Sequence, residues 1–361
     1  MTAIEVPTGP AAPAPVTVLL VAGTQVRLRQ LEQLVAGPGY VVVGGARDAE
    51  FAEGLVRELR PATVLVDLEL FGGGLEAIER IMAAVPTPIV VCGAAAEHPE
   101  AAIGAGAVDV VGALDVPAGS PQYAEFLRRH LRVASRVRVI THPRARLRAR
   151  HVAQPGADPA TTRPPVVAFG ASTGGPPALA TILGDLPDDF PAAVLVVQHM
   201  AAGFVEGLAR WLDGVCPLRV VVAADGERIS SGTVYLAPAG LNLSLRSGHR
   251  VELVEPPATQ FHVPGIDRTF ASVAEVCRDR AVGVLLTGMG RDGALGLRTL
   301  RDVGAFTIGQ DEATSVVWGM PAAAQQADAV DLELPLGAIA GAVTDAVSRV
   351  RRPANPVGGL R

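Results

Sequence analysis

Short apolar runs alternate with amphipathic segments along most of the chain. In the first half these runs are rich in Val, Leu and Ile and are bounded by Gly, Pro and Ala, which is typical of buried strands. They predict strands at Thr17–Val21, Tyr40–Val43, Thr63–Val66, Ile89–Val91 and Val108–Val111, and helices over 22–34 and at Ala49–Leu59, Leu75–Ala84, Pro99–Ala105 and Gln122–Val137. This alternation predicts a parallel sheet with right-handed crossovers, of flavodoxin-like size and rhythm.

The same alternation resumes in the second half of the chain. It predicts strands at Val166–Phe169, Ala193–Val197, Leu218–Val222, Val234–Ala237, Val282–Thr287 and Phe306–Gly309. Helices fit between them at Pro176–Leu183, Phe204–Asp213, Ile266–Arg278, Ala294–Val303, Pro321–Ala327 and Leu336–Val350. Asn242–Val254 favours an antiparallel hairpin that turns at Ser247-Gly248. We therefore expect a second α/β domain, doubly wound and mostly parallel, with one antiparallel excursion.

Between these halves lies a segment rich in Arg, Pro and Ala without an apolar period. With 361 residues in all, we place a first domain at 16–137, a linker at 138–164 and a second domain at 165–352. Residues 128–150 hold nine arginines and no acid. Because this stretch carries no aromatic side chains for base stacking and no binding motif, we expect a solvated, partner-facing linker and no nucleic-acid partner.

The amino-acid composition limits the binding partners, the reaction mechanisms and the cellular compartment that we expect. The net charge of −5 is too mild to indicate a nucleic-acid or membrane partner for the whole chain. All 31 basic residues are arginine, so any mechanism that needs a lysine amine is excluded. Cys92, Cys216 and Cys277 are far apart and lack metal-ligand spacing, so we expect small buried thiols and no structural disulfide. Without a secretory signal or an unbroken apolar span, we expect a cytoplasmic protein with no membrane insertion.

Three polar side chains follow predicted strands of the second domain. Ser172 lies in a G-x-S-x-G turn after Val166–Phe169, His199 follows Ala193–Val197, and Asp292 follows Val282–Thr287 in a glycine-rich turn. Each has an ordinary structural explanation: a capping serine, a satisfied histidine and a helix N-cap. Together they have the composition of a nucleophile, a base and an orienting carboxylate, because the carboxyl ends of parallel strands converge on one crevice.

The chain order of these three side chains is Ser, His, Asp. This differs from the Ser, Asp, His order of the α/β-hydrolase fold, so the shared G-x-S-x-G does not indicate that fold. A fourth polar cluster, at 309–321, contains Asp311 and Glu312. Two carboxylates without a histidine or cysteine fit a polar or capping loop better than a metal site. We expect no cofactor and no metal.

Four long segments, in this order, resemble the catalytic domain of the CheB family of chemotaxis protein-glutamate methylesterases. They are VVAFGASTGGPPAL (166–179), VVQHM (196–200), LTGMGRDGALGL (286–297) and GQDEATSVVWGMPAAA (309–324). The first 130 residues resemble the receiver domain of these response regulators. The resemblance implies a catalytic triad of Ser172, His199 and Asp292, with backbone groups of Thr173 and Met289 lining the site and stabilising the oxyanion.

The resemblance also implies a substrate. Members of this family hydrolyse glutamate γ-methyl esters on the cytoplasmic helices of methyl-accepting chemoreceptors during adaptation, opposed by a methyltransferase, and also deamidate some receptor glutamines. A receiver domain further implies a histidine kinase as partner. Asn242 and Gly265 stand where relatives often carry a histidine and a serine, so we expect them to affect substrate fit more than chemistry.

The receiver-like half departs from the pattern that phosphorylation requires. Ala22-Gly23 replace the acidic pair after the first strand, Cys92-Gly93 follow the fourth strand without a hydroxyl, and Gly112-Ala113 follow the fifth without a lysine. Asp67 is the one remaining candidate phospho-acceptor. Because one carboxylate is a poor Mg²⁺ site and nothing offsets the incoming phosphoryl charge, we expect a pseudo-receiver with Asp67 unused.

Two other readings remain open from the sequence. The protein could be a catalytically idle regulatory or scaffold relative that inherited both domains. Alternatively, it could be a serine hydrolase of another, smaller ester. The intact Ser172, His199 and Asp292 set favours an active esterase over the idle relative.

Overall fold

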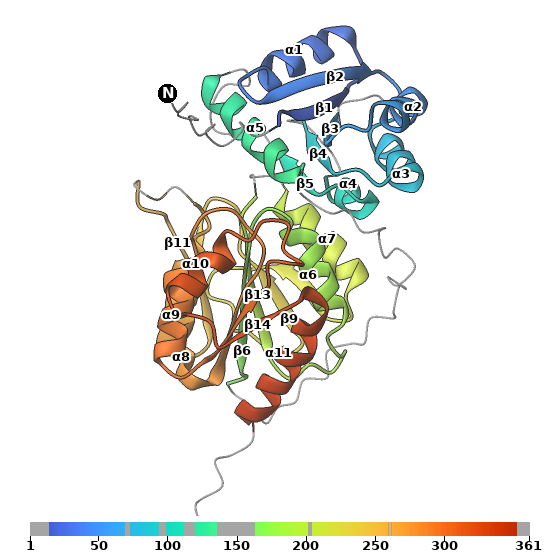
Figure 1. The fold of residues 1–361 in the computed structure, drawn as a ribbon. Helices are drawn as coiled ribbons and strands as arrows, with labels where there is room; N and C mark the ends of the chain where they lie inside the picture. Colours follow the sequence, from blue (N-terminus) through green and yellow to red (C-terminus); the bar gives the residue numbers. More distant parts are fainter. Residues whose placement is uncertain are drawn as a thin grey trace, which may run out of the picture.

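A computed structural model describes residues 14–68, 73–93, 99–111, 120–135, 163–200, 204–258, 260 and 262–351. Most of the predicted linker, the first 13 residues, Gly112-Ala113 and the predicted end of the helix at Val137 lie outside these described residues. The chain forms two α/β halves, one above the other in Figure 1. The described helices include none that is long and apolar enough to cross a membrane.

The first half is built on a five-stranded parallel sheet of order β2-β1-β3-β4-β5. Its strands are β1 (Val16–Val21), β2 (Tyr40–Ala46), β3 (Thr63–Asp67), β4 (Ile89–Cys92) and β5 (Asp109–Val111). Its helices are α1 (Gln25–Val35), α2 (Ala49–Leu59), α3 (Gly74–Ala84), α4 (Pro99–Ala105) and α5 (Pro121–Ala134). This strand order is flavodoxin-like, as predicted. Helices α1 and α5 cover one face of the sheet, and α2, α3 and α4 cover the other.

The second half is built on a seven-stranded parallel sheet of order β14-β13-β12-β6-β7-β9-β8. Its strands are β6 (Val166–Ala171), β7 (Ala193–Gln198), β8 (Arg219–Val222), β9 (Thr233–Leu236), β12 (Ala281–Leu285), β13 (Phe306–Gln310) and β14 (Leu332–Leu334). The predicted hairpin is confirmed, because β10 (Asn242–Arg246) and β11 (Arg250–Val254) pair antiparallel. The predicted doubly wound, mostly parallel architecture is therefore confirmed.

Helices cover both faces of the seven-stranded sheet (Figure 1). They are α6 (Gly175–Gly184), α7 (Val205–Val215) and α11 (Leu336–Arg351) on one face, and α8 (Ile266–Cys277), α9 (Ala294–Asp302) and α10 (Met320–Gln326) on the other. Alternation along β6 explains the two layers: Val167 and Phe169 join the first core, while Val166 and Ala168 join the second. All six residues of β6 are buried, which accounts for the unbroken apolar run in the sequence.

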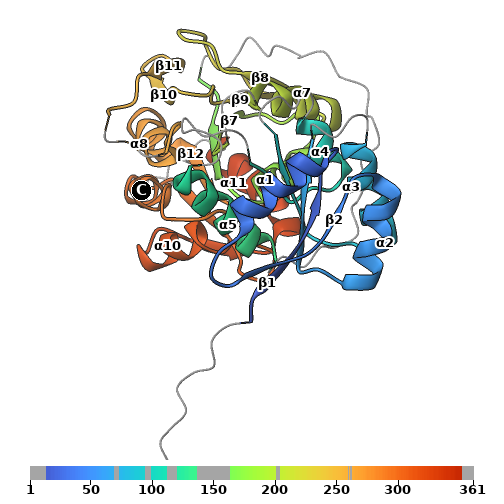
Figure 2. The same ribbon diagram turned by 90° about the horizontal axis from the view of Figure 1, so that it is seen from above.

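The two halves touch through α4 and α7, which lie side by side in Figures 1 and 2. Trp211 of α7 packs against the core of the first half. The contact is close at Gly104 of α4, where an added Cβ would lie 3.2 Å from Nε1 of Trp211. The receiver-like domain is thereby held against one end of the catalytic sheet.

Candidate active site

Ser172 and His199 directly follow the ends of two neighbouring strands, β6 and β7. The register of β6 and β7 pairs Ala171 with Gln198, and the very next residues are Ser172 and His199. Backbone hydrogen bonds continue beyond the strands, because His199 N donates to Ala171 O at 2.9 Å. Parallel pairing thus places the predicted nucleophile and base at neighbouring carboxyl ends, the side of such sheets where ligands bind.

Glycines let the loops around Ser172 come close. In the turn after β6, Gly174 adopts φ +77°, a left-handed conformation that suits glycine. On the neighbouring β12–α9 loop, a Cβ at Gly288 would lie 2.7 Å from the Cβ of Ser172. Ser172 N donates to Thr287 O at 3.0 Å, which fixes the two loops to each other. The loop that carries Met289 and Asp292 therefore starts directly beside the serine.

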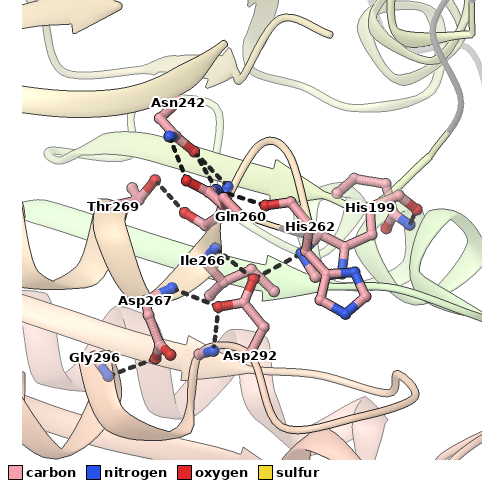
Figure 3. A network of polar contacts seen from close by, with 12 residues as sticks. His199, Asn242, Gln260, His262, Ile266, Asp267, Thr269, Asp292 and Gly296 are labelled. Atoms are coloured by element: carbon pink, nitrogen blue, oxygen red, sulfur yellow. Dashed lines mark hydrogen bonds and ion pairs between the residues drawn. The ribbon is translucent and has the colours of Figure 1, made fainter. Parts of the chain in front are cut away.

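Asp292 orients His199. The Nε2 atom of His199 lies 2.9 Å from Oδ2 of Asp292, and both side chains are largely buried. Backbone amides hold the same carboxylate: it accepts from Ile266 N at 2.8 Å, Asp267 N at 3.0 Å and Gly293 N at 3.0 Å. Figure 3 shows Asp292 between the histidine and the start of α8. Asp292 therefore does not cap α9, whose N-cap is Gly293; instead its side chain satisfies the first amides of α8.

The hydrogen bonds keep Asp292 ionised. Burial alone would raise the pKa of its carboxyl group, but the bonds from His199 and from the amides of α8 outweigh burial and lower that pKa below 3.8. Asp267 shows the opposite balance, because burial, together with the nearby Asp292 charge, raises its pKa despite the amide of Gly296. An ionised carboxylate at Nε2 selects the tautomer of His199 that leaves Nδ1 as the acceptor.

His199 Nδ1 is buried and has no hydrogen-bond partner in the described residues. Ser172 is partly exposed, and no hydrogen bond joins it to His199. The structure thus brings His199 and Asp292 into contact and Ser172 into the neighbouring position. Serine–histidine contacts of this kind often tighten only when substrate is present.

Two backbone donors face no protein acceptor. Within the described part of the chain, the N–H groups of Thr173 and Met289 make no hydrogen bond. Both flank Ser172: Thr173 follows it directly, and Met289 follows Gly288, which abuts it. Thr173 itself is buried and its carbonyl accepts from Thr287 Oγ1 at 2.9 Å, so the peptide is rigidly held.

The sequence analysis did not predict that two further residues, Gln198 and His262, contact Ser172 or His199. Buried Gln198 donates through Nε2 to the carbonyls of Ser172 and His199, each at 2.9 Å, and so ties the two turns together. His262 stacks on His199 with ring centroids 4.9 Å apart and planes 10° from parallel. Burial, His199 and Arg129 lower the pKa of His262, which favours its neutral form. Gln198 could have been predicted, because a glutamine that ends a buried apolar strand needs hydrogen-bond partners. His262 follows no predicted strand, so the sequence pattern did not indicate its position.

The two unusual positions of the catalytic half contact each other. Asn242 Oδ1 accepts from Gly265 N at 2.8 Å, and the Asn242 side chain exchanges two 2.9 Å hydrogen bonds with Gln260. Figure 3 shows this network behind the start of α8. A Cβ at Gly265 would lie 2.7 Å from Gln260 Nε2. Asn242 therefore supports the helix whose first amides bind Asp292.

Hydrogen bonds between its own residues stabilise the polar loop after β13. Asp311 Oδ1 accepts from both N and Oγ1 of Thr314, at 3.0 and 2.5 Å. Trp318 closes the loop by donating from Nε1 to Gln310 O at 3.2 Å. Over the described residues, no group of three His, Cys, Asp or Glu side chains could hold a metal ion.

In the receiver-like half, Asp67 ends β3 and is paired with an arginine. Arg27 Nε lies 2.6 Å from Asp67 Oδ2, and the aspartate side chain is 1% exposed. The sequence analysis recognised the missing metal ligands and lysine but not this guanidinium, which comes from the first turn of α1. A permanent cation therefore occupies one side of the only candidate acceptor.

A small cavity lies between the two halves at the histidine. It is lined by Ile103, Asp109 and Val110 of the receiver-like half together with Gln198, His199 and Met200 of the catalytic half, and with Pro176, Phe204 and Leu208. The receiver-like domain thus borders the site on the side of His199.

These features define a class of protein: a hydrolytic α/β enzyme joined to a receiver-like domain. A family model described as CheB methylesterase matches residues 167–343. The protein-glutamate methylesterase/protein-glutamine glutaminase 1 of Cupriavidus pinatubonensis is 43% identical over 325 residues, covering 88% of this chain and 93% of that protein. The protein-glutamate methylesterase FrzG of Myxococcus xanthus is 39% identical over 333 residues, covering 90% and 97%.

Among solved structures, the methylesterase catalytic domain of Thermotoga maritima CheB is 36% identical, covers 51% of this chain and 98% of its own, and has a TM-score of 0.49. The extent of the sequence matches settles the family. The chain belongs to the CheB methylesterase family, and it is a hydrolase.

Proposed function

We propose that this protein hydrolyses glutamate γ-methyl esters on chemoreceptors, and deamidates receptor glutamines, through Ser172, His199 and Asp292. The observation that carries the proposal is the buried His199–Asp292 pair, which leaves Nδ1 of His199 without a partner in the described residues and lies at the strand end next to that of Ser172. The names of the two relatives support the substrate class. In an adaptation system, this reaction opposes a glutamyl methyltransferase.

The acylation half-reaction begins at the serine. Ser172 Oγ attacks the ester carbonyl carbon while His199 Nδ1 takes the hydroxyl proton, and Asp292 stabilises the resulting imidazolium. The N–H groups of Thr173 and Met289, which have no protein acceptor in the described residues, donate to the oxyanion. As the C–O bond breaks, the proton passes from Nδ1 to the leaving oxygen and methanol departs. For a glutamine the leaving group is ammonia.

Deacylation mirrors these steps. Water loses a proton to His199 Nδ1 and attacks the acyl carbon, and the proton then returns to Ser172 Oγ as the glutamyl carboxylic acid is released. Throughout, the bonds from Asp292 and from Gln198 hold the imidazole and the two turns in register.

The decisive experiment compares methanol release from a methylated receptor fragment by the wild type and by Ser172→Ala. We expect a loss on the order of 10⁴-fold or more in kcat for the variant. Release from neither protein would support the idle regulatory relative. Release from small model esters alone would support a hydrolase of another ester.

We also propose that control of the esterase does not run through aspartyl phosphate. Arg27 already compensates the Asp67 charge at 2.6 Å, and Ala22 and Cys92 supply neither a carboxylate nor a hydroxyl. A phosphoryl group at Asp67 would therefore lack the metal that stabilises its transfer.

To test this, the full chain is incubated with Mg²⁺ and acetyl phosphate, or with beryllofluoride, and its intact mass and esterase rate are measured. We expect no adduct and no activation. A stoichiometric adduct at Asp67 together with a faster esterase rate would contradict the proposal.

A further inference from the structure

A cavity of about 490 Å³ is lined by Asp292 and by residues of α8, α9 and α10. His262 and Gln260 line it as well, so the cavity adjoins the Asp292 carboxylate that binds His199 and the histidine that stacks on His199. Its wall is mixed. Two guanidinium groups, Arg268 of α8 and Arg291 of the β12–α9 loop, join a small apolar surface made by Ala294, Leu295, Ala323 and Ala327.

The two arginines are not neutralised by the protein. Arg268 donates from Nε to the hydroxyl of Ser244 at 3.2 Å, and Arg291 is exposed. Neither forms an ion pair with a carboxylate of the described residues. Most other arginines of the α9 region differ in this respect: Arg298 and Arg301 bind Asp302, Asp328 and Asp331.

The two carboxylates in the cavity wall, Asp267 and Asp292, already accept hydrogen bonds from other parts of the protein. Asp292 is bound to His199 and to three amides, and Asp267 accepts from Gly296 N at 2.6 Å. The pKa of His262 is lowered by burial, which favours a neutral ring that adds no positive charge to this wall. Arg268 and Arg291 are therefore the groups of this wall whose charged N–H donors have no carboxylate partner in the described residues.

We infer that Arg268 and Arg291 form a carboxylate-binding subsite that selects glutamyl esters flanked by acidic side chains on the substrate. The inference rests on the proposed function, because the occupant is a segment of the same protein substrate. Arginine binds carboxylates well through paired N–H groups. On a helical substrate, residues three or four apart share one face, so an acid one turn from the ester reaches the arginines while the ester reaches Ser172.

The apolar part of the wall fits the same occupant. Leu295 is 69% exposed, which is unusual for a leucine, and the three alanines beside it leave room for a helix to approach closely. An amphipathic helix with alanine-sized and acidic positions would cover Leu295 and compensate both arginines.

The test measures peptide binding to the full-length Ser172→Ala protein, so that it does not depend on turnover. The probes are two fluorescein-labelled helical peptides with the same glutamine target, one flanked by glutamates at three- and four-residue spacing and one with those glutamates replaced by glutamine. Fluorescence anisotropy gives Kd for Ser172→Ala and for the same protein with Arg268→Gln or Arg291→Gln added. Arg219→Gln is the matched control, because Arg219 is exposed at the amino end of β8.

We expect each added substitution to weaken binding of the acidic peptide about tenfold, as charged hydrogen bonds of this kind do, and to leave the neutral peptide unaffected. Arg219→Gln should change neither Kd. Arg291→Glu should in turn bind a peptide with lysines in the flanking positions better than Ser172→Ala alone does. Equal affinity for the two peptides, or equal weakening of both, would overturn the inference.

Methanol release separates this inference from the proposed function. If the wild type releases no methanol from the methylated acidic peptide while the anisotropy results hold, the proposed function fails and the subsite stands. If methanol is released but Kd does not change when the arginines or the flanking glutamates are replaced, the inferred subsite is wrong and the proposed function stands.

Discussion

The Asp292 carboxylate joins three segments of the chain: the end of β7, the start of α8 and the loop before α9. Its proposed role in turnover depends on the bond to His199 Nε2, while its structural role depends on the amides of Ile266 and Asp267. Substituting this residue therefore tests both roles, which different measurements distinguish.

The kinetic prediction concerns the tautomer of His199. In Asp292→Asn the amide no longer stabilises the imidazolium, so kcat for methanol release should fall about 10⁴-fold, as in other triads. Asp189→Asn is the matched control, because Asp189 is an exposed aspartate of the same domain. A kcat within tenfold of the wild type would contradict the role of Asp292.

The stability prediction concerns pH. Because hydrogen bonds lower the pKa of folded Asp292 below 3.8, its ionised form stabilises the fold at pH values above the unfolded pKa. That contribution is lost as the pH falls through the folded pKa. Urea unfolding should therefore show a gap between the wild type and Asp292→Asn that is widest near neutral pH and narrows below about pH 4. A gap that widens in acid would contradict the assignment.

At the scale of elements, α8 and α9 are packed through a glycine. A Cβ at Gly296 would lie 2.7 Å from both Asp267 O and the Cβ of Phe270. Since Asp267 N binds Asp292, any separation of these helices moves the carboxylate that orients His199. Helix packing and catalysis are coupled at this point.

Gly296→Ala should therefore lower the free energy of unfolding by about 1–3 kcal/mol through overpacking, and it should also lower kcat. Gly54→Ala is the matched control. Gly54 is a helical, exposed glycine with no atom near its missing Cβ, so the substitution should stabilise the protein by about 0.5–1 kcal/mol. Urea unfolding of the two variants measures both effects, and equal signs would refute the packing argument.

The elements that the sequence predicted well are those whose pattern is local. Buried strands such as β6 are continuous apolar runs, and the rule that loops after parallel strands share one edge predicted that Ser172, His199 and Asp292 lie close together. The short edge strand β14 was missed, because its three residues include an exposed Glu333 and no apolar run. Arg27 beside Asp67 and His262 beside His199 were missed because only tertiary contacts bring them together.

At the scale of the whole molecule, we expect the contact between α4 and α7 to restrict access to the site. Receiver residues line the same cavity as His199, and Trp211 packs against the receiver core. Because Arg27 pairs with Asp67, we expect that phosphate does not drive a separation of the two halves.

Trp211→Ala should loosen this contact and raise methanol release by the full-length protein about tenfold, because truncating an aromatic anchor of an interface costs more than about 1 kcal/mol. Phe51→Ala is the control: Phe51 lies on α2 and is 55% exposed. Unchanged or slower release by Trp211→Ala would show that the receiver-like domain does not restrict the site.

The two tryptophans of the chain lie in different surroundings. Trp211 is at the domain contact, and Trp318 closes the loop after β13. Indole emission shifts to longer wavelength when water reaches the ring, so each ring is a built-in optical probe. In a Trp318→Phe background, the emission maximum of Trp211 alone would follow the separation of the two halves during turnover, without any attached dye.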